Sequence, residues 1–362
     1  MRRALILALG TAFCAAPLAQ GAAAPAPLTK APATKAPAYK APRNAFGQPD
    51  LSGVWNNATL TPLTRQAKFG LRATYTPEEV KALEGDAQRE VVEGNQPTDP
   101  NAPATAKNPS SVALRPQYAA AGGDTGGYNR GWLDPGSAVM RVGGEPRNSL
   151  LTTPDGQFPP RKAGAPPMRG YRSLGSFDNP EQRPLGERCI MGFGRNAGPP
   201  MLPNGFYNDN YQIVQTGDAV VIDVEMVHDV RIVRLNSKHR TDGVRPWMGD
   251  SIGWWEGDTL VVETTNIPQA EELAGAWKDL KVTERFTRVG KDRLRYAFTV
   301  EDPMVWDKPW GGEYEFAPLN GVIYEYACHE GNYALPSMLS AARQAERDAA
   351  KARAGEPSGS QP

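Results

Sequence analysis

The sequence predicts a mainly β fold in which antiparallel strands form a meander that closes into a barrel. In the second half of the chain, apolar and polar residues alternate with the two-residue period of half-buried strands. Short turn sequences such as Gly257-Asp258 separate these runs, as expected for successive hairpins. The 362 residues also include 37 Gly and 34 Pro, about a fifth of the chain, which favours short strands and long loops over a helical bundle. Closing the meander into a barrel would pair its two edge strands.

The first 45 residues are predicted to lie outside the folded domain. A basic start, an apolar run over residues 4–17 and small residues at 19–21 form the three parts of a secretory signal, so residues 1–21 are interpreted as a cleaved signal peptide. The apolar run is too short to span a membrane comfortably. Residues 22–45 are rich in Ala, Pro and Lys and are interpreted as a disordered spacer. We therefore expect a periplasmic or secreted protein with no transmembrane segment after signal removal.

Two helices are predicted, one near each end of the chain. Thr76 and Glu79 have the spacing of a capping box around Pro77, which predicts a short N-terminal helix that runs to Val92. Residues 337–362 are Ala-rich and charged and are predicted to form a C-terminal helix and tail.

Residues 46–336 are predicted to form a single β-barrel domain. Within it, residues 94–205 lack periodicity and are rich in Pro and Gly, so we expect a long loop insertion that wraps the barrel. Strands are expected at residues 50–55, 211–215, 220–232, 252–256, 259–265, 282–289, 293–300 and 322–329.

One long predicted strand, residues 220–232, carries a histidine on its apolar face. From Val220 to Ile232 every even-numbered residue is apolar or histidine, whereas the odd-numbered residues are mixed. This alternation predicts a strand whose even-numbered side chains point into the barrel. His228 would then lie inside.

The charge distribution argues against nucleic acid as a partner. The two tails carry ten basic and three acidic residues, so residues 44–336 have a net charge of −7 although the whole chain is neutral. A body of this charge has no field that attracts phosphates. A small-molecule ligand or substrate is the expected partner.

Two cysteines, Cys189 and Cys328, remain once residues 1–21 are removed. In an oxidising compartment an even pair favours a disulfide. A metal site would need more ligands at close spacing, and the sequence has no C-x-x-C motif. We expect a bridge that ties the loop insertion to the last strand.

Several strings in the sequence resemble known families. Gly53-Val54-Trp55 resembles the G-x-W motif of lipocalin-like (calycin) barrels, which implies a lipocalin-like barrel with an arginine from the last strand packed on the tryptophan. Residues 322–328, expected to form that strand, contain no arginine. The strings at residues 49–55, 247–253, 255–262 and 324–333 resemble a largely uncharacterised family of exported bacterial proteins. The second resemblance implies export and a single β-rich fold, and it supplies no reaction.

Ionisable side chains inside an apolar barrel are the first candidates for catalysis. Glu284 shares a strand face with Val282 and Phe286, so Glu284 and His228 are expected to meet in one interior. Burial would raise the pKa of the carboxyl group and a neighbour would tune the imidazole, as general acid–base catalysis requires. The alternative is a structural His–Glu pair.

His329 and Glu330 are further catalytic candidates because they follow Cys328 where the last strand is expected to end. A metal site formed by these residues with His228 and Asp229 is the alternative, but no H-x-H or H-E-x-x-H pattern supports it, so we predict no metal. The sequence also lacks a Gly-rich phosphate loop after a strand, and no cofactor is expected.

Aromatic and amide side chains in or beside the predicted loops would suit a flat or apolar ligand. Packing or turn roles remain the alternative for most of them. The candidate substrate-binding residues are Tyr128, Trp132, Asn208, Tyr211, Trp247 and Trp254.

These observations favour an exported protein with a small-molecule pocket. The leading hypothesis is a cofactor-independent acid–base enzyme, a lyase, isomerase or cyclase, that acts on an apolar or aromatic substrate. The alternatives are a lipocalin-type binding protein without turnover and a structural protein of the cell envelope. A cavity without a paired His and carboxylate would favour binding, and a filled barrel would favour the structural role.

Overall fold

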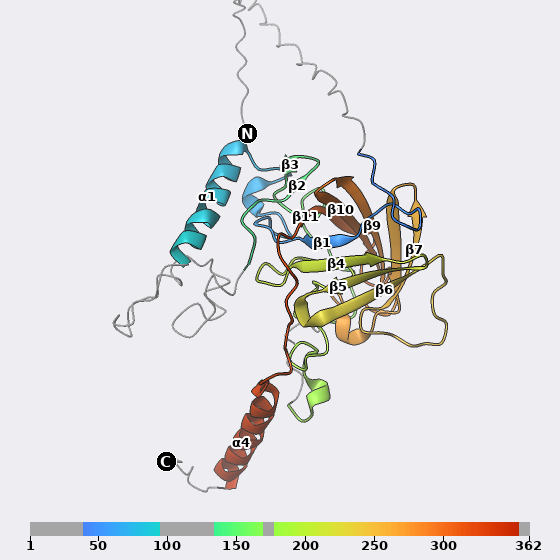
Figure 1. Ribbon diagram of the computed structural model, residues 1–362. Coiled ribbons are helices and arrows are strands. Elements are labelled where there is room, and N and C mark those ends of the chain that lie inside the picture. The colour runs from blue at the N-terminus through green and yellow to red at the C-terminus, as the bar shows by residue number, and fades with distance from the viewer. Residues whose placement is uncertain (1–38, 95–133, 169–176, 355–362) are drawn as a thin grey trace, which may run out of the picture. The chain divides into compact units, whose positions relative to one another are not determined.

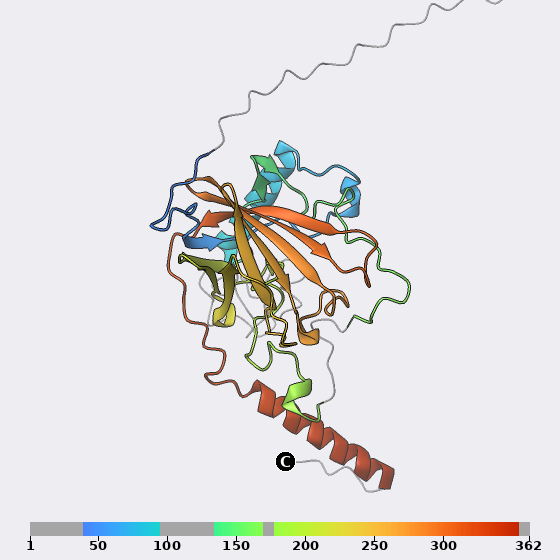
Figure 2. The ribbon, with the colours of Figure 1, turned by 90° about the vertical axis from the view of Figure 1, so that its right-hand side faces the viewer.

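Nine strands close into a barrel in the computed structural model, which describes residues 39–94, 134–168 and 177–354 (Figure 1). The barrel strands are β1 (Gly53–Asn56), β4 (Asn210–Gln215), β5 (Ala219–Val224), β6 (Asp229–Leu235), β7 (Asp250–Glu256), β8 (Thr259–Thr265), β9 (Lys281–Gly290), β10 (Arg293–Glu301) and β11 (Trp310–Pro318). β1 pairs with both β4 and β11 and so closes the barrel, which confirms the predicted mainly β fold (Figures 1 and 2).

The strand order departs from a pure meander at one place. Neighbouring strands are antiparallel except β6 and β7, which are parallel. A parallel pair requires a crossover connection, because the chain must return to the end of the barrel from which it came. Residues 236–249 provide this connection.

Helix α1 (Pro77–Gly94) begins as the sequence predicts. The Glu79 amide donates to Thr76 Oγ1 at 3.3 Å, and the Thr76 amide donates to Glu79 Oε2 at 2.8 Å, so the capping box forms. The C-terminal helix α4 (Ala334–Ala354) begins three residues earlier than expected. The short elements are η1 (Ala67–Phe69), β2 (Arg141–Val142), β3 (Glu145–Pro146), η2 (Pro180–Gln182), η3 (Met226–His228) and η4 (Gln269–Glu271).

The chain is already packed on the barrel before residue 46, the predicted start of the domain. Ala41 is buried, and Arg43 forms an ion pair with Asp258 at 2.6 Å. The predicted signal peptide and the spacer up to residue 38 lie outside the described residues.

Trp55 closes one end of the barrel. Its indole is buried and donates from Nε1 to the Leu51 carbonyl at 3.0 Å. The Arg288 guanidinium lies over the Trp55 ring, 5.6 Å from its centre, and donates to the Asp50 carbonyl. An arginine therefore packs on this tryptophan as the G-x-W motif implies, but it comes from β9 and not from residues 322–328.

The single strand predicted for residues 220–232 is wrong, because β5 and β6 form a hairpin there. Met226–His228 make the turn, and Val224 pairs with Asp229 across it. Paired residues of an antiparallel hairpin share a face, so even-numbered residues point inward on β5 and odd-numbered residues point inward on β6. Ile232 is accordingly 57% exposed on the outer face.

The last strand is β11, and the strand predicted for residues 322–329 is absent from the structure. The sequence of β11 begins with Trp310-Gly311-Gly312, which resembles a turn. A Cβ atom on Gly312 would lie 2.6 Å from the Leu150 carbonyl oxygen, so glycine lets the backbone near Leu151 pair with β11. Residues 319–328, which we call the strap, run back from β11 toward the β5–β6 hairpin.

The predicted disulfide forms between Cys189 and Cys328, whose Cα atoms are 5.6 Å apart. This bond joins the long loop before β4 to the end of the strap, and it is consistent with an extracytoplasmic protein. Neither helix of the described residues is long and apolar enough to cross a membrane.

The hairpin predicts opposite effects of the same substitution at neighbouring positions. Val233→Asp places a charge in the core, where the side chain is fully buried, and should lower the free energy of unfolding by about 3 kcal/mol or more. Ile232→Asp faces solvent and should change it by roughly 0.5 kcal/mol or less. Urea unfolding of the two variants measures both effects, and equal losses would contradict the assigned facing.

Candidate functional site

A loop of the chain fills the barrel interior and passes beside the β5–β6 turn. We call residues 191–202 the plug. Met201 is fully buried between two interior tyrosines: its amide donates to Tyr296 Oη at 2.9 Å, and its carbonyl accepts from Tyr314 Oη at 3.0 Å. Two groups of the barrel wall that could bind a ligand therefore bind the backbone of the plug.

A buried ion pair lies beside Met201. Arg231 donates from Nη1 and Nη2 to Glu284 Oε1 and Oε2, at 3.2 and 2.5 Å, and both side chains are at most 2% exposed. Tyr296 donates to Glu284 Oε1 at 2.7 Å. Burial and the charge of Glu284 raise the pKa of Tyr296 well above its ordinary value, so this hydroxyl keeps its proton and remains a donor. Glu284 points inward as predicted, but its partners are arginine and tyrosine.

His228 does not enter the barrel, and the expected meeting with Glu284 is wrong. Its position in the β5–β6 turn leaves the side chain exposed, and Nε2 accepts a hydrogen bond from the Tyr326 amide of the strap at 3.1 Å. Glu225, in the same turn, accepts from the Tyr324 amide at 3.0 Å. These two side chains hold the strap against the hairpin.

The other predicted site residues do not form one group. His329 and Glu330 are exposed in the turn before α4, and no strand ends there. Trp247 is 44% exposed in the β6–β7 crossover, and Trp254 donates to Glu256 near the end of β7.

Of the predicted binding residues, only Tyr211 reaches the interior among those that the structure describes. Its hydroxyl donates to the Asn196 carbonyl of the plug at 3.1 Å. Asn208 is half-buried in the turn before β4, and its carbonyl accepts from the Asn196 side chain. Tyr128 and Trp132 lie outside the described residues.

Two carboxyl groups that the sequence did not indicate as acid–base candidates lie near the plug end of the barrel. Asp229 opens β6 with an inward side chain, and its Oδ2 accepts from the Gly192 amide at 2.7 Å. Burial raises the pKa of Asp229 to about 6. Burial also raises the pKa of Glu271 to about 7, and the charge of Asp229 adds to this shift while Arg195 opposes it.

Arg195 of the plug lies between Glu271 and the charged centre of the barrel. Its Nη1 donates to the Glu271 carbonyl at 3.1 Å, and its Nη2 donates to the Pro199 carbonyl. Burial lowers the pKa of Arg195, and the charges of Glu271 and Glu284 oppose that shift. Its Nε has no hydrogen-bond acceptor among the described residues. A half-buried cation with a spare donor is therefore held beside Glu271.

A second polar network joins the plug to β1 and β4. Asn57 donates from Nδ2 to the hydroxyls of Tyr211 and Tyr314, at 3.2 and 3.1 Å. Asn196 donates from Nδ2 to Asp209 Oδ1 at 2.8 Å. Burial is the main cause that raises the pKa of Asp209 to about 8.

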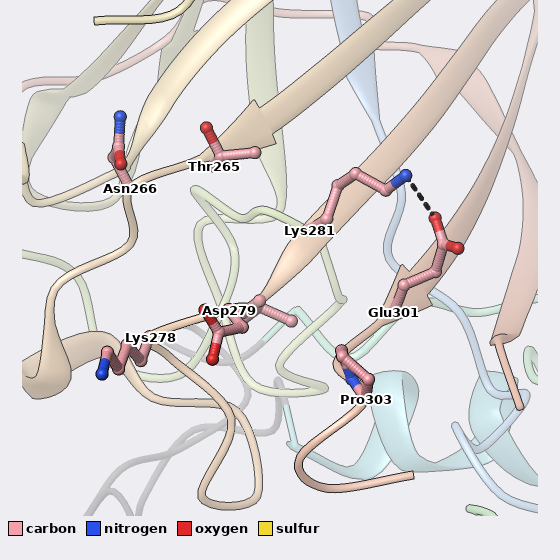
Figure 3. Close-up of a pocket in the computed structure, with 8 residues that line it drawn as sticks. Thr265, Asn266, Lys278, Asp279, Lys281, Glu301 and Pro303 are labelled. Atoms are coloured by element: carbon pink, nitrogen blue, oxygen red, sulfur yellow. Dashed lines mark ion pairs between the residues drawn. The ribbon is translucent and has the colours of Figure 1, made fainter. Parts of the chain in front are cut away.

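A pocket of about 420 Å³ opens elsewhere, where β8 ends and β9 begins (Figure 3). Its charged groups include Lys281 and Glu301, paired at 2.9 Å. Nearby, His239 contacts Asp250 at 2.9 Å and Glu263 at 3.2 Å, so this histidine joins the crossover to β7 and β8. The pocket is lined by Thr265, Asn266, Lys278, Asp279, Leu280, Lys281, Glu301 and Pro303.

Comparison of the chain with protein-family models and with curated proteins gave no match. The described residues also contain no group of three or more His, Cys, Asp or Glu side chains arranged to hold a metal ion.

The buried ion pair predicts strongly non-additive effects on stability. Glu284→Ala leaves Arg231 charged and unpaired in the core and should cost about 3–5 kcal/mol of unfolding free energy. The double variant Arg231→Met/Glu284→Leu removes both charges and should cost less than Glu284→Ala alone. Denaturant unfolding of both proteins tests this, and additive losses would show that the two side chains act independently.

Proposed function

We propose that this protein is an exported, cofactor-independent acid–base enzyme whose site lies at the plug end of the barrel. Glu271 and Asp229 are the proton-transferring groups of the proposal, and Arg195 binds a polar or anionic group of an apolar or aromatic substrate. The observation that carries the proposal is a pair of interacting carboxyl groups, on different elements, whose pKa values of about 7 and 6 lie near neutrality, with Arg195 beside Glu271.

The electrostatics support distinct roles for the two carboxyl groups. A general acid or base is most effective when its pKa is near the working pH, because both protonation states are then available. Asp229 is nearly fully buried and held by the Gly192 amide, whereas Glu271 is half-buried and so more accessible to a substrate. We assign the direct proton transfer to Glu271. Asp229 is assigned the role of raising the pKa of Glu271 through its negative charge.

This assignment replaces the one expected from the sequence. His228 serves the strap, and both carboxylate oxygens of Glu284 already bind Arg231. A carboxylate bound on both oxygens by a guanidinium is a weak proton acceptor. Within the proposal, Glu284 and Tyr296 are positioning residues that hold the plug and thereby Arg195.

A second candidate function is a non-catalytic structural role. It is favoured by one observation: the plug fills the barrel interior with Met201, which binds the tyrosine hydroxyls directly. Under this alternative, substitutions at the carboxyl groups would change only stability.

Proton exchange provides a test that does not require the substrate to be known. The full chain is incubated in D₂O with a panel of aryl ketones and arylacetic acids, and loss of their acidic C–H signals is followed by NMR. We expect exchange of at least one compound, slowed about 10²–10⁴-fold by Glu271→Gln. Glu256→Gln, an exposed glutamate at the end of β7, is the matched control and should exchange at the wild-type rate.

Arg195→Met should weaken binding of the exchanged compound while the fold is retained. Exchange that is unaffected by Glu271→Gln would refute the assigned base. If no compound exchanges and both variants change only the melting temperature, the structural role is favoured instead.

The raised pKa of Glu271 also predicts how stability depends on pH. A carboxyl group whose pKa is higher in the folded than in the unfolded state stabilises the fold at low pH, and this contribution is lost as pH rises through the folded pKa. Wild-type protein should therefore lose stability relative to Glu271→Gln between about pH 5 and pH 8. Parallel denaturant titrations across this range measure the difference, and a difference that is constant with pH would contradict the raised pKa.

A further inference from the structure

Three buried oxygen atoms at the junction of the plug, β1 and β4 lack a hydrogen-bond donor among the described residues. They are Asp209 Oδ2, Asn57 Oδ1 and Asn196 Oδ1. The three residues are at most 2% exposed. An unpaired polar atom at such depth costs about 1–3 kcal/mol, so a set of three requires an explanation.

The backbone brings the three side chains to one place. Asn56, the last residue of β1, pairs with Asn210, the first residue of β4. The neighbouring residues, Asn57 after β1 and Asp209 before β4, also meet, because the Asn57 amide donates to the Asp209 carbonyl at 3.0 Å. Asn57 and Asp209 are therefore opposite one another. Asn196 reaches them from the plug through its 2.8 Å bond to Asp209 Oδ1.

The orientation of both amide groups is fixed by their partners. Asn57 Nδ2 donates to the hydroxyls of Tyr211 and Tyr314, whose protons are already given to the carbonyls of Asn196 and Met201. Turning the Asn57 amide over would place its oxygen against these two hydroxyl oxygens.

The Asn196 amide is fixed in the same way. Its Nδ2 donates to the Asp209 carboxylate and the Asn208 carbonyl, which are both acceptors, so turning it over would set oxygen against oxygen. The Oδ1 atoms of Asn57 and Asn196 are therefore hydrogen-bond acceptors without a donor among the described residues.

The surroundings are negative. Asp134 and Glu225 lie close enough for their negative charges to act on Asp209. Glu225 binds only the Asn210 side chain and the Tyr324 amide, and none of the three carboxylates forms an ion pair within the described residues. Carboxylate and amide oxygens are the ligands that hard divalent cations prefer.

We infer that Asp209, Asn57 and Asn196 form a binding site for a divalent cation of the calcium class, with Asp209 Oδ2 and the two amide oxygens as ligands. One bound cation satisfies the three acceptors together, whereas a single water has only two protons to donate. It also compensates the negative charge of the carboxylates. Because Asn196 belongs to the plug, the cation fastens the plug to β1 and β4. This inference is independent of the proposed function.

Calcium-dependent stability of the full chain is the first test. Protein stripped with EGTA is melted with increasing CaCl₂, and separately with MgCl₂, followed by circular dichroism. We expect the melting temperature to rise by about 5 °C at a calcium concentration of ~100 times Kd. Asp209→Asn should abolish the rise. Asp292→Asn, the same charge change at an exposed site in the β9–β10 turn, should leave it intact.

Terbium luminescence is the second test and does not depend on a variant that folds. Tb³⁺ takes calcium sites, and Asn57 lies 3.2 and 3.1 Å from the hydroxyls of Tyr211 and Tyr314, so excitation of tyrosine should sensitise a bound ion. We expect emission that saturates with Tb³⁺ and is displaced by Ca²⁺. The inference is overturned if neither cation raises the melting temperature and no calcium-displaceable emission is seen. If Asp209→Asn is then also more stable than wild type, the result would indicate that Asp209 is protonated in the folded protein and binds no cation.

Discussion

The ion pair between Arg231 and Glu284, with the Tyr296 hydroxyl, sets the arrangement of the barrel interior. Two opposite charges are stable at this depth only when each is paired and hydrogen-bonded, which fixes the separation of β6, β9 and β10 on the inner side. Tyr296 in turn accepts the Met201 amide, so the same cluster determines where the plug enters. The barrel interior therefore contains specific polar contacts between the barrel wall and the plug, in addition to apolar packing.

The position of the plug has consequences on two sides. Arg195 and Asn196 are consecutive residues, and the path of the chain sends them to different groups: Arg195 to the Glu271 carbonyl and Asn196 to Asp209. The proposed acid–base site and the inferred cation site are therefore mechanically linked through one peptide. The disulfide at Cys189 ties the chain just before the plug to the strap, so the strap adds a covalent restraint to this arrangement.

Local sequence patterns predicted the parts of the fold that depend on local rules. The β7–β8 and β9–β10 hairpins follow from alternation and turn residues, and Glu284 was placed inside because Val282 and Phe286 share its face. The β5–β6 turn was missed because Val227, with a φ of +59°, is a residue type that rarely adopts this conformation. That one turn moved His228 out of the barrel. It also placed Arg231 inside, where no pattern had indicated a charge.

The residues of the candidate site could not be predicted for a different reason. Arg195, Asp229 and Glu271 lie on three separate elements, and their common feature is that each belongs to the plug or contacts it. Removing water is what raises the pKa values of both carboxyl groups, since a solvated carboxylate would titrate near its ordinary value. A filled barrel and an acid–base site are therefore compatible here. The plug that occupies the interior also contacts both residues, through the Gly192 amide to the Asp229 carboxylate and through Arg195 to the Glu271 carbonyl.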